Sequence, residues 1–559
     1  MPNAVRTPPD VRHLRREARD REMRNLVDQG TLPMTQRCAA MTVGQRLSFS
    51  ATVNPRRTLF SATVLSYVLL AVAFCAQAST QQLYAVAGVA LGLSALLVLF
   101  SFKQAVLLVV LVTHLGPLVR WDTGVVGAFT IGDLFLIMCV LRWVAEFRPS
   151  RARPVSSLTR MVCMLAGLAA LSCAFTPDLH IASTGIVNLA QFFLVYGLVY
   201  SEIRSPRDVA RLLHMISATV LVCGTLHLYA YAHDIPMSLS LDPSNEWFGS
   251  KERLEVAHNS MLYFQKNYYF YPTFIASCCA AFALSISHLL TRPRLKVSSY
   301  AFHCSVLMVC VAEGLEQGSR TILITCVLSV AFAITMVLRA HRKVAIWRSL
   351  AAITAIPVLV SGAIALQRSA LSEAQQVAFS NMLVGGADES WGDRVEMLRD
   401  FTGKLLFYPR ILAVGLGPNV PLTGPQLPEV SRLMYIDALG TQVPSFHNFY
   451  ADVLVQFGLG FFVIFVLMLA STVARLWRAC VGGDVVMEAC FCGLVAWLIL
   501  WNSHATPWTK PVLIFAELLA SGHVLLEIRR GAARMPVLRG ADKLRSVLTA
   551  APGARGRSL

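Results

Sequence analysis

The sequence predicts an all-α membrane protein with about fourteen transmembrane helices, and three observations carry this prediction. Of its 559 residues, 55% are hydrophobic and only 14% are charged, and the mean hydropathy is +0.57. A single soluble core cannot bury so much apolar surface. Apolar runs of about 17–22 residues, the length that crosses a bilayer as a helix, recur from Leu59 onward. The basic residues lie between these runs in a one-sided pattern.

The apolar runs define the predicted spans. We interpret each one as a helix because lipid offers no partner to backbone N–H and C=O groups, so each segment must satisfy its own. We expect spans at about residues 59–76, 83–101, 104–119, 126–145, 158–176, 183–201, 210–231, 271–290, 298–314, 320–338, 349–367, 447–472, 484–502 and 511–527.

The distribution of Lys and Arg predicts the orientation of these spans. If the N-terminus is cytoplasmic, the short inner connections hold 18 basic residues, whereas the short outer ones hold only Arg120, Arg320 and Lys510. Basic residues favour the cytoplasmic side. Both termini should therefore be cytoplasmic, and the long loops 232–270 and 368–446 should face outward. In a Gram-negative bacterium that side is the periplasm, and the protein would be a multi-pass inner-membrane protein.

Three parts follow from this topology. Residues 1–57 form a basic arm, for which we expect a solvated or disordered cytoplasmic segment attracted to anionic lipid. Residues 58–528 form the membrane domain, and 529–559 a basic cytoplasmic tail. The net charge of +17 lies in short clusters rather than on one continuous face, so we predict no nucleic-acid partner. Most of the 14 cysteines fall in apolar runs. We therefore predict that the chain has no disulfide framework and no CxxC metal site.

The second long loop contains two helix-like stretches, "SEAQQVAFSNML" and "WGDRVEMLRDFTGKLL". We expect the latter to lie over the membrane mouth as a lid, because a loop of this length in a compact protein is usually functional. The loop also carries Arg394 and Arg410 and the stretch "GLGP", which we interpret as a tight turn at Gly415–Pro418.

A second outward feature is Ser319-Arg320, at the outer end of the tenth span. A lone arginine outside runs against the positive-inside trend. Its planar fork of donors suits a phosphate, but an ion pair with Glu313 or Glu316 would explain it equally well.

The third feature is "VPSFHNFYADVLVQFGLGFFVIFV", which runs from a polar loop into an apolar span. Ser445 is the expected N-cap, which puts His447 in the first helical turn. The positive end of the helix dipole disfavours the imidazolium form. A neutral imidazole is able to accept a proton as a general base. The alternative is a histidine in a capping turn that performs no chemistry.

No acidic metal site is visible on the outer face. The first outer loop, "AQASTQQ", has no carboxylate, and "GADESWGDR" in the large loop is typical of a helix N-terminus. We therefore predict no metal and no cofactor.

Taken in order, these residues resemble the O-antigen ligase and polymerase superfamily of bacterial envelope enzymes. His447-Asn448 is followed by nine residues and then Gly458, as the signature of the ligases requires, but its second glycine is displaced from 461 to 460. The family often has an acidic residue two positions before the first glycine, but this chain has Gln456 there. The resemblance covers about residues 180–500.

Three further elements agree with the family in order and position. Ser319-Arg320 opens a span, and Arg394 precedes the Gly415–Gly417 turn before the histidine. In "FQKNYYFYPTFIA", Lys266 and Asn267 stand where the family more often has Pro-Asn.

The resemblance implies a GT-C-like, metal-independent, inverting glycosyltransferase whose donor is a glycan on undecaprenyl diphosphate. In that interpretation His447 is the base, and Arg320 and Arg394 are catalytic charges under the diphosphate. The residues expected to bind substrate are Asn448, Arg410, Lys266 and Ser319. The acceptor would be a second lipid-linked chain or lipid A core. Membrane lipids and a chain-length regulator would be further partners.

Three functions stay open at this point. The span count and the displaced glycine favour a polymerase, of exopolysaccharide or O-antigen, over an O-antigen ligase. A polysaccharide flippase or transporter also has twelve to fourteen spans. The long outer loop and the shortage of charges inside the spans argue against it. The main acidic residues there are Asp133, Asp452, Glu488 and Glu517, most of them near helix ends.

Overall fold

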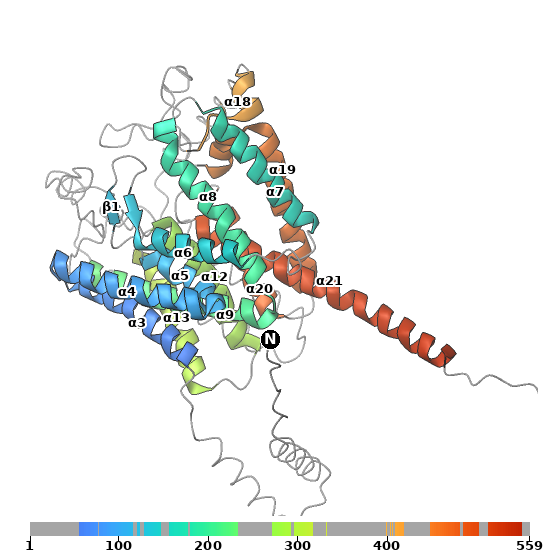
Figure 1. Ribbon diagram of the computed structural model, residues 1–559, viewed down its shortest axis with the longest axis horizontal. Helices are drawn as coiled ribbons and strands as arrows, with labels where there is room; N and C mark the ends of the chain where they lie inside the picture. The colour runs from blue at the N-terminus through green and yellow to red at the C-terminus, as the bar shows by residue number, and fades with distance from the viewer. Residues whose placement is uncertain are drawn as a thin grey trace, which may run out of the picture. The chain divides into compact units, whose positions relative to one another are not determined.

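The computed structural model describes residues 55–232, 271–316, 408–418, 448–501 and 512–549, with short gaps inside these ranges and a few isolated positions between them. The chain divides into two units, Met1–Thr58 and Leu59–Leu559. The second unit holds nearly all of the described residues, and it is a bundle of α-helices (Figure 1).

The described helices follow the predicted apolar runs closely. They are α3 (Pro55–Cys75), α4 (Thr80–Phe100), α5 (Phe102–Leu115), α6 (Ile131–Ala145), α7 (Ser157–Ala174), α8 (Leu179–Glu202), α9 (Pro206–Ala232), α12 (Tyr271–Thr291), α13 (Val297–Glu316), α18 (Pro409–Val414), α19 (Phe449–Cys480), α20 (Val485–Leu500) and α21 (Val512–Thr549). Twelve of the fourteen predicted spans coincide with one of these helices. The other two, 320–338 and 349–367, fall almost entirely outside the described residues.

Five of the described helices are long and apolar enough to cross a membrane by length and composition alone. They are Pro55–Ala73, Gln81–Phe100, Ser157–Ala174, Pro206–Leu226 and Phe449–Cys480. Several other described helices are equally apolar but shorter, among them α5 and α20. The protein is therefore a multi-pass helical membrane protein.

One short hairpin interrupts the helices, at the place where the fourth span was expected to begin. Strand β1 (Arg120–Asp122) pairs antiparallel with β2 (Ala128–Thr130). Helix α6 starts only at Ile131, behind a capping box in which Thr130 and Asp133 bond each other's backbone N–H groups. The Asp133 carboxylate also accepts a hydrogen bond from Gln191 at 2.7 Å. This buried acid thus has a structural role at a helix end.

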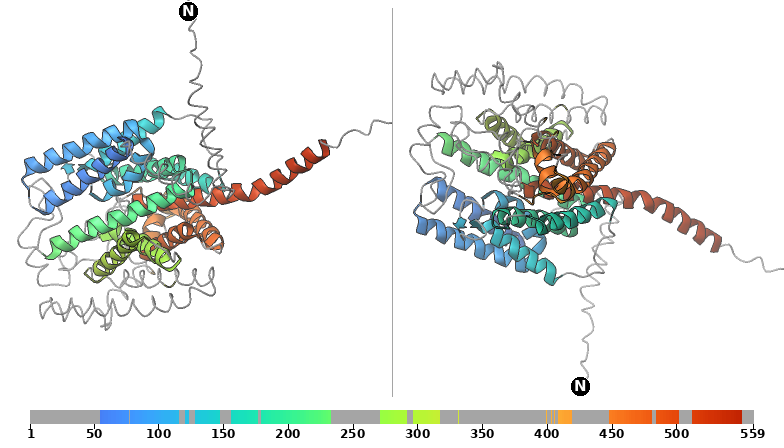
Figure 2. Two further views of the ribbon diagram at one scale, coloured as in Figure 1. Left: turned by 90° about the horizontal axis from the view of Figure 1, so that it is seen from below. Right: turned by 90° about the horizontal axis from the view of Figure 1, so that it is seen from above.

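Buried polar side chains join helices that are far apart in the sequence. Tyr67 of α3 and Ser94 of α4 are hydrogen-bonded at 3.1 Å, and these two helices lie side by side in Figure 2. The ring of His523 in α21 bonds Tyr196 of α8 at 2.7 Å and Thr472 of α19 at 2.9 Å. Inside a membrane, where apolar contacts give little preference for one helix over another, such bonds help to select the partner.

Helices α12 and α20 approach each other closely at Gly493. A Cβ atom built on Gly493 would lie 3.0 Å from the Cβ of Ala280. Small residues at such a contact let two backbones pack closely, which is the main source of helix association in lipid.

Replacing Gly493 with leucine should therefore separate α12 from α20. We expect a loss of about 1–3 kcal/mol of stability, the usual cost of overpacking, seen as a lower melting temperature in detergent. Gly88→Leu is the matched control, because nothing lies within 4 Å of the position of its Cβ. Equal melting temperatures for the two variants would contradict this account of the contact.

Candidate active site

The region around the His447-Asn448 motif is organised by a junction of glycines. The junction, as we use the term, consists of the turn Gly415–Gly417 and the break at Gly458 inside α19. Helix α18, which leads into the turn, packs against α19 and α7 (Figure 1). The sequence predicted the turn, and its two glycines both have positive φ angles.

Backbone hydrogen bonds hold the turn against α19. The N–H groups of Leu416 and Gly417 donate to the carbonyl oxygens of Val455 and Gln456, at 3.0 and 2.9 Å. The Ser172 hydroxyl of α7 donates to the same Gln456 carbonyl at 2.6 Å. A break in a helix leaves backbone carbonyls without their partners, and lipid cannot supply substitutes. The turn therefore stabilises the break.

Only glycine fits the conformation at this junction. Gly458 has φ 79° and ψ 174°, and Gly415 has φ 76° and ψ −175°. This region is essentially restricted to glycine, because a side chain would collide with its own backbone. A Cβ on Gly415 would also lie 2.2 Å from the Gln456 carbonyl oxygen, and one on Gly458 would lie 2.8 Å from that of Ala413.

The break at Gly458 divides α19 into a short first segment and a longer second segment. The part after Gly458, residues 459–480, is about 33 Å long at 1.5 Å per residue and is able to cross the hydrocarbon layer of about 30 Å alone. The part before it, 449–457, is not needed for the crossing. The break is thus able to orient this first segment, and the motif at its start, independently of the span.

The start of α19 is fixed by its cap and by α20. The Asn448 side-chain oxygen accepts hydrogen bonds from the N–H groups of Tyr450 and Ala451, both at 3.1 Å. The Phe449 N–H donates to the carbonyl of Trp501 at 2.9 Å, and the two rings stack with centroids 4.1 Å apart. Asn448 is therefore the N-cap. The expectation that Ser445 caps this helix is wrong, because the described helix begins at Phe449.

A buried polar stripe runs from this cap toward the break, and the sequence analysis did not identify it. Asn448, Asp452 and Gln456 are spaced four residues apart, so they share one face of the first segment. Asp452 and Gln456 are both buried. Among the described residues, the Gln456 side-chain oxygen has no hydrogen-bond partner. The i, i+4, i+8 spacing of polar residues inside an apolar segment is the signal that would have found this stripe.

Of the other predicted site residues, the structure describes Arg410. Its guanidinium is exposed and donates to the backbone carbonyl of Phe175, the C-cap of α7, at 3.1 Å. Arg410 and Asn448 thus lie on elements that pack together around the junction. The remaining predicted residues lie outside the described residues: His447, Arg320, Ser319, Arg394 and Lys266. The two helix-like stretches of the second long loop, including the expected lid, lie largely outside them too.

Comparison with known proteins shows a similarity to one family over part of the chain. The sequence model described as O-antigen ligase matches residues 303–466. The match begins in α13, includes the turn of the junction, and ends in α19 beyond Gly458. No curated protein matches the chain. The family acts in polysaccharide biosynthesis, and its members transfer glycosyl groups. Residues 303–466 are therefore similar to the O-antigen ligase and polymerase superfamily.

Proposed function

We propose that the protein is an inner-membrane glycosyltransferase that transfers or polymerises oligosaccharide carried on undecaprenyl diphosphate, at the periplasmic face, during synthesis of a surface polysaccharide. The observation that carries the proposal is the family match over residues 303–466. That range contains His447-Asn448, the junction and the candidate arginines.

The proposal includes the full topology. We propose fourteen spans, with the arm 1–57 and the tail 529–559 in the cytoplasm and the membrane domain at 58–528. Several described contacts support it. The helix that leads into the turn of the junction bonds the C-terminal end of α7, the turn bonds the first segment of α19, and the start of α19 bonds the end of α20. In the proposed topology each of these ends faces the periplasm, so their contact is what that topology requires.

The proposed reaction is an inverting displacement. His447 takes the proton from a hydroxyl of the acceptor sugar, and the hydroxyl oxygen attacks the anomeric carbon of the donor. The bond between that carbon and the diphosphate oxygen breaks, and undecaprenyl diphosphate leaves with the electron pair. Diphosphate is already a good leaving group, so the reaction needs positive charge around it more than a metal.

The proposed binding residues surround that leaving group. Arg320 and Arg394 offset the charge that develops on the diphosphate, where a fixed cation in a site shielded from water acts most strongly. Arg410, Lys266, Ser319 and Asn448 contribute to binding. The exposed position of Arg410 beside the junction supports its part in this scheme.

Purified protein in lipid nanodiscs tests the proposal when it is given only undecaprenyl-diphosphate-linked repeats. We expect lipid-linked chains of increasing length, the product of a polymerase. A parallel reaction adds lipid A core. Sugar transferred to the core, without any chain growth in its absence, would establish the ligase alternative. Movement of labelled donor across proteoliposomes without a new glycosidic bond would contradict both and favour a transporter.

A further inference from the structure

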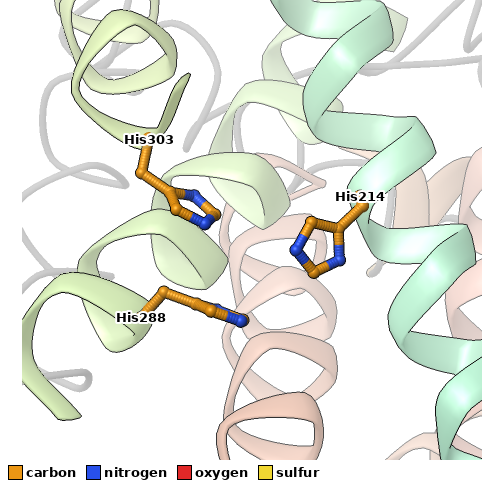
Figure 3. A group of neighbouring side chains, drawn as sticks. All are labelled: His214, His288 and His303. Atoms are coloured by element: carbon orange, nitrogen blue, oxygen red, sulfur yellow. The ribbon is translucent and has the colours of Figure 1, made fainter. Parts of the chain in front are cut away.

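Three histidines from three helices converge at a site that the proposed reaction does not use. They are His214 of α9, His288 of α12 and His303 of α13 (Figure 3). One ring nitrogen from each lies within 4.8 Å of those of the other two. We propose that these histidines form a binding site for a divalent transition-metal ion, with Zn²⁺ as the best fit.

Hydrogen bonds set the rings for coordination. The Nδ1 atoms of His214 and His288 contact the backbone carbonyls of Ala210 and Leu284, at 2.6 and 3.1 Å. A carbonyl oxygen only accepts, so in both neutral rings Nδ1 carries the proton and Nε2 carries the lone pair. Nδ1 of His303 contacts the Ser285 hydroxyl at 3.1 Å. Histidine ligands of metals usually hold their second nitrogen in this way, which fixes the ring and its tautomer.

The geometry needs only a small closure around a metal. Ligand nitrogens on a tetrahedral zinc lie about 3.3 Å apart, from Zn–N distances of about 2.0–2.1 Å. The rings of His288 and His303 are already stacked at 4.8 Å, and His214 stands edge-on to His288 at 5.2 Å. The ligand nitrogens lie within 4.8 Å of one another, so each pair has to close by at most about 1.5 Å to reach the separation found on zinc.

Burial and access also suit a bound ion. His288 and His303 are buried, whereas His214 is partly exposed. Three imidazoles with one open side give a three-histidine set plus a position for water, and imidazole suits zinc, copper, nickel and iron.

The cluster lies away from the junction. Glu488, which faces Ser287, is in the first turn of α20, whereas Trp501, which receives the Phe449 N–H, directly follows the last. About 20 Å of helix separate these two positions at 1.5 Å per residue. In the proposed topology the cluster belongs to the cytoplasmic half of the membrane. The proposal is therefore independent of the glycosyl transfer.

Two other buried histidines show what a purely structural role looks like. Both ring nitrogens of His114 are engaged, by the Val110 carbonyl at 2.8 Å and by the Ser277 hydroxyl at 3.0 Å. Both ring nitrogens of His523 are also engaged, by the hydroxyls of Tyr196 and Thr472. Neither joins another group of potential ligands among the described residues. His114 is the matched control, because it combines a backbone carbonyl with a serine as the cluster does.

The test measures metal on protein purified with a tag that contains no histidine. Chelator-treated protein is incubated with Zn²⁺, dialysed and analysed by mass spectrometry for metal per chain. We expect one Zn²⁺ in the unchanged protein and in His114→Ala. In His214→Ala, whose partly exposed ring makes it the mildest variant, affinity should fall at least about tenfold. Loss of all three histidines should abolish binding.

Spectroscopy decides the matter even if the triple variant does not fold. Co²⁺ bound by three imidazoles in a tetrahedral site gives intense visible ligand-field bands, which we expect from the unchanged protein and not from His214→Ala. Zn²⁺ should also raise the melting temperature of chelator-treated protein, because an ion that binds only the folded state stabilises it. Equal metal content in His214→Ala and the unchanged protein, or unchanged protein without Co²⁺ bands, would overturn the proposal.

Discussion

Replacing His447 with alanine is expected to reduce glycan transfer at least about a hundredfold, the usual contribution of a general base. The amount of folded protein in the membrane should stay near that of the unchanged chain. The start of α19 is held by the Asn448 cap and by the bond from Phe449 to Trp501. The substitution leaves both in place, so the loss should be chemical rather than structural.

Two further substitutions separate chemistry from structure. His447→Gln keeps a polar side chain of similar size but accepts no proton at neutral pH, so it should fail like alanine. Asn448→Ala removes the cap and should cost about 1 kcal/mol of stability, whereas Asn448→Asp keeps a capping oxygen. If Asn448→Asp is as stable as the unchanged chain but transfers poorly, Asn448 also binds substrate.

The measurement is initial rate of chain growth, normalised to monodisperse protein after size exclusion. His447→Gln and His447→Ala should show the same deficit at saturating donor, because the step that is lost follows binding. Transfer by either variant at the rate of the unchanged protein would exclude His447 as the base. The proposed site would then have to be rebuilt around the polar stripe at Asp452 and Gln456.

The sequence predicted the helices well because length and apolarity are local properties. Each apolar run of sufficient length has one favourable structure in lipid, so the spans from 59–76 to 210–231 were found with errors of a few residues at their ends. The hairpin at 120–130 was missed because its two strands of three residues are too short for an alternating pattern. The N-cap was placed at Ser445 because serine and asparagine are equally good caps, and only the hydrogen bonds distinguish them.

Only the local features of the candidate site were predictable from the sequence. The motif His447-Asn448 identified the start of α19, and Gly415–Pro418 was correctly interpreted as a turn. No local pattern indicates that this turn docks on the break at Gly458, because the two are joined by tertiary hydrogen bonds. The three histidines were missed for the same reason. His214, His288 and His303 lie on three separate helices, and no spacing in the sequence relates them.

The second prediction uses two glycines of α19 that are two residues apart and should respond in opposite directions to the same change. Gly458→Ala places a side chain in a conformation that costs about 1–3 kcal/mol for any residue but glycine. Its Cβ would also meet the Ala413 carbonyl oxygen at 2.8 Å. The atom nearest to a Cβ built on Gly460 is Cδ1 of Leu168, 4.0 Å away. Gly460→Ala should therefore gain about 1 kcal/mol from helix propensity.

We expect the Gly458→Ala variant to relieve this strain by forming a continuous helix. That change returns the Val455 and Gln456 carbonyls to α19 and withdraws them from the turn, so the bonds from Leu416 and Gly417 are lost. The first segment, with Asn448 at its start, is then reoriented. We expect Gly458→Ala to melt at a lower temperature and to lose most of its transfer activity, while Gly460→Ala melts slightly higher and remains active.

Melting temperature and initial rate of chain growth, measured together on both variants, distinguish the break from the family signature. The signature of the ligases has its second glycine at 461, where this chain has Phe, and its nearest glycine is Gly460. If the signature required a glycine at that place, Gly460→Ala should impair transfer. If the break is what matters, only Gly458→Ala should impair transfer. Position 461 already has a packing role without glycine, because Phe461 is buried and its ring stacks on those of Phe457 and Phe465, with centroids 4.5 and 6.0 Å away. Normal activity and stability in Gly458→Ala would show that α19 works without its break.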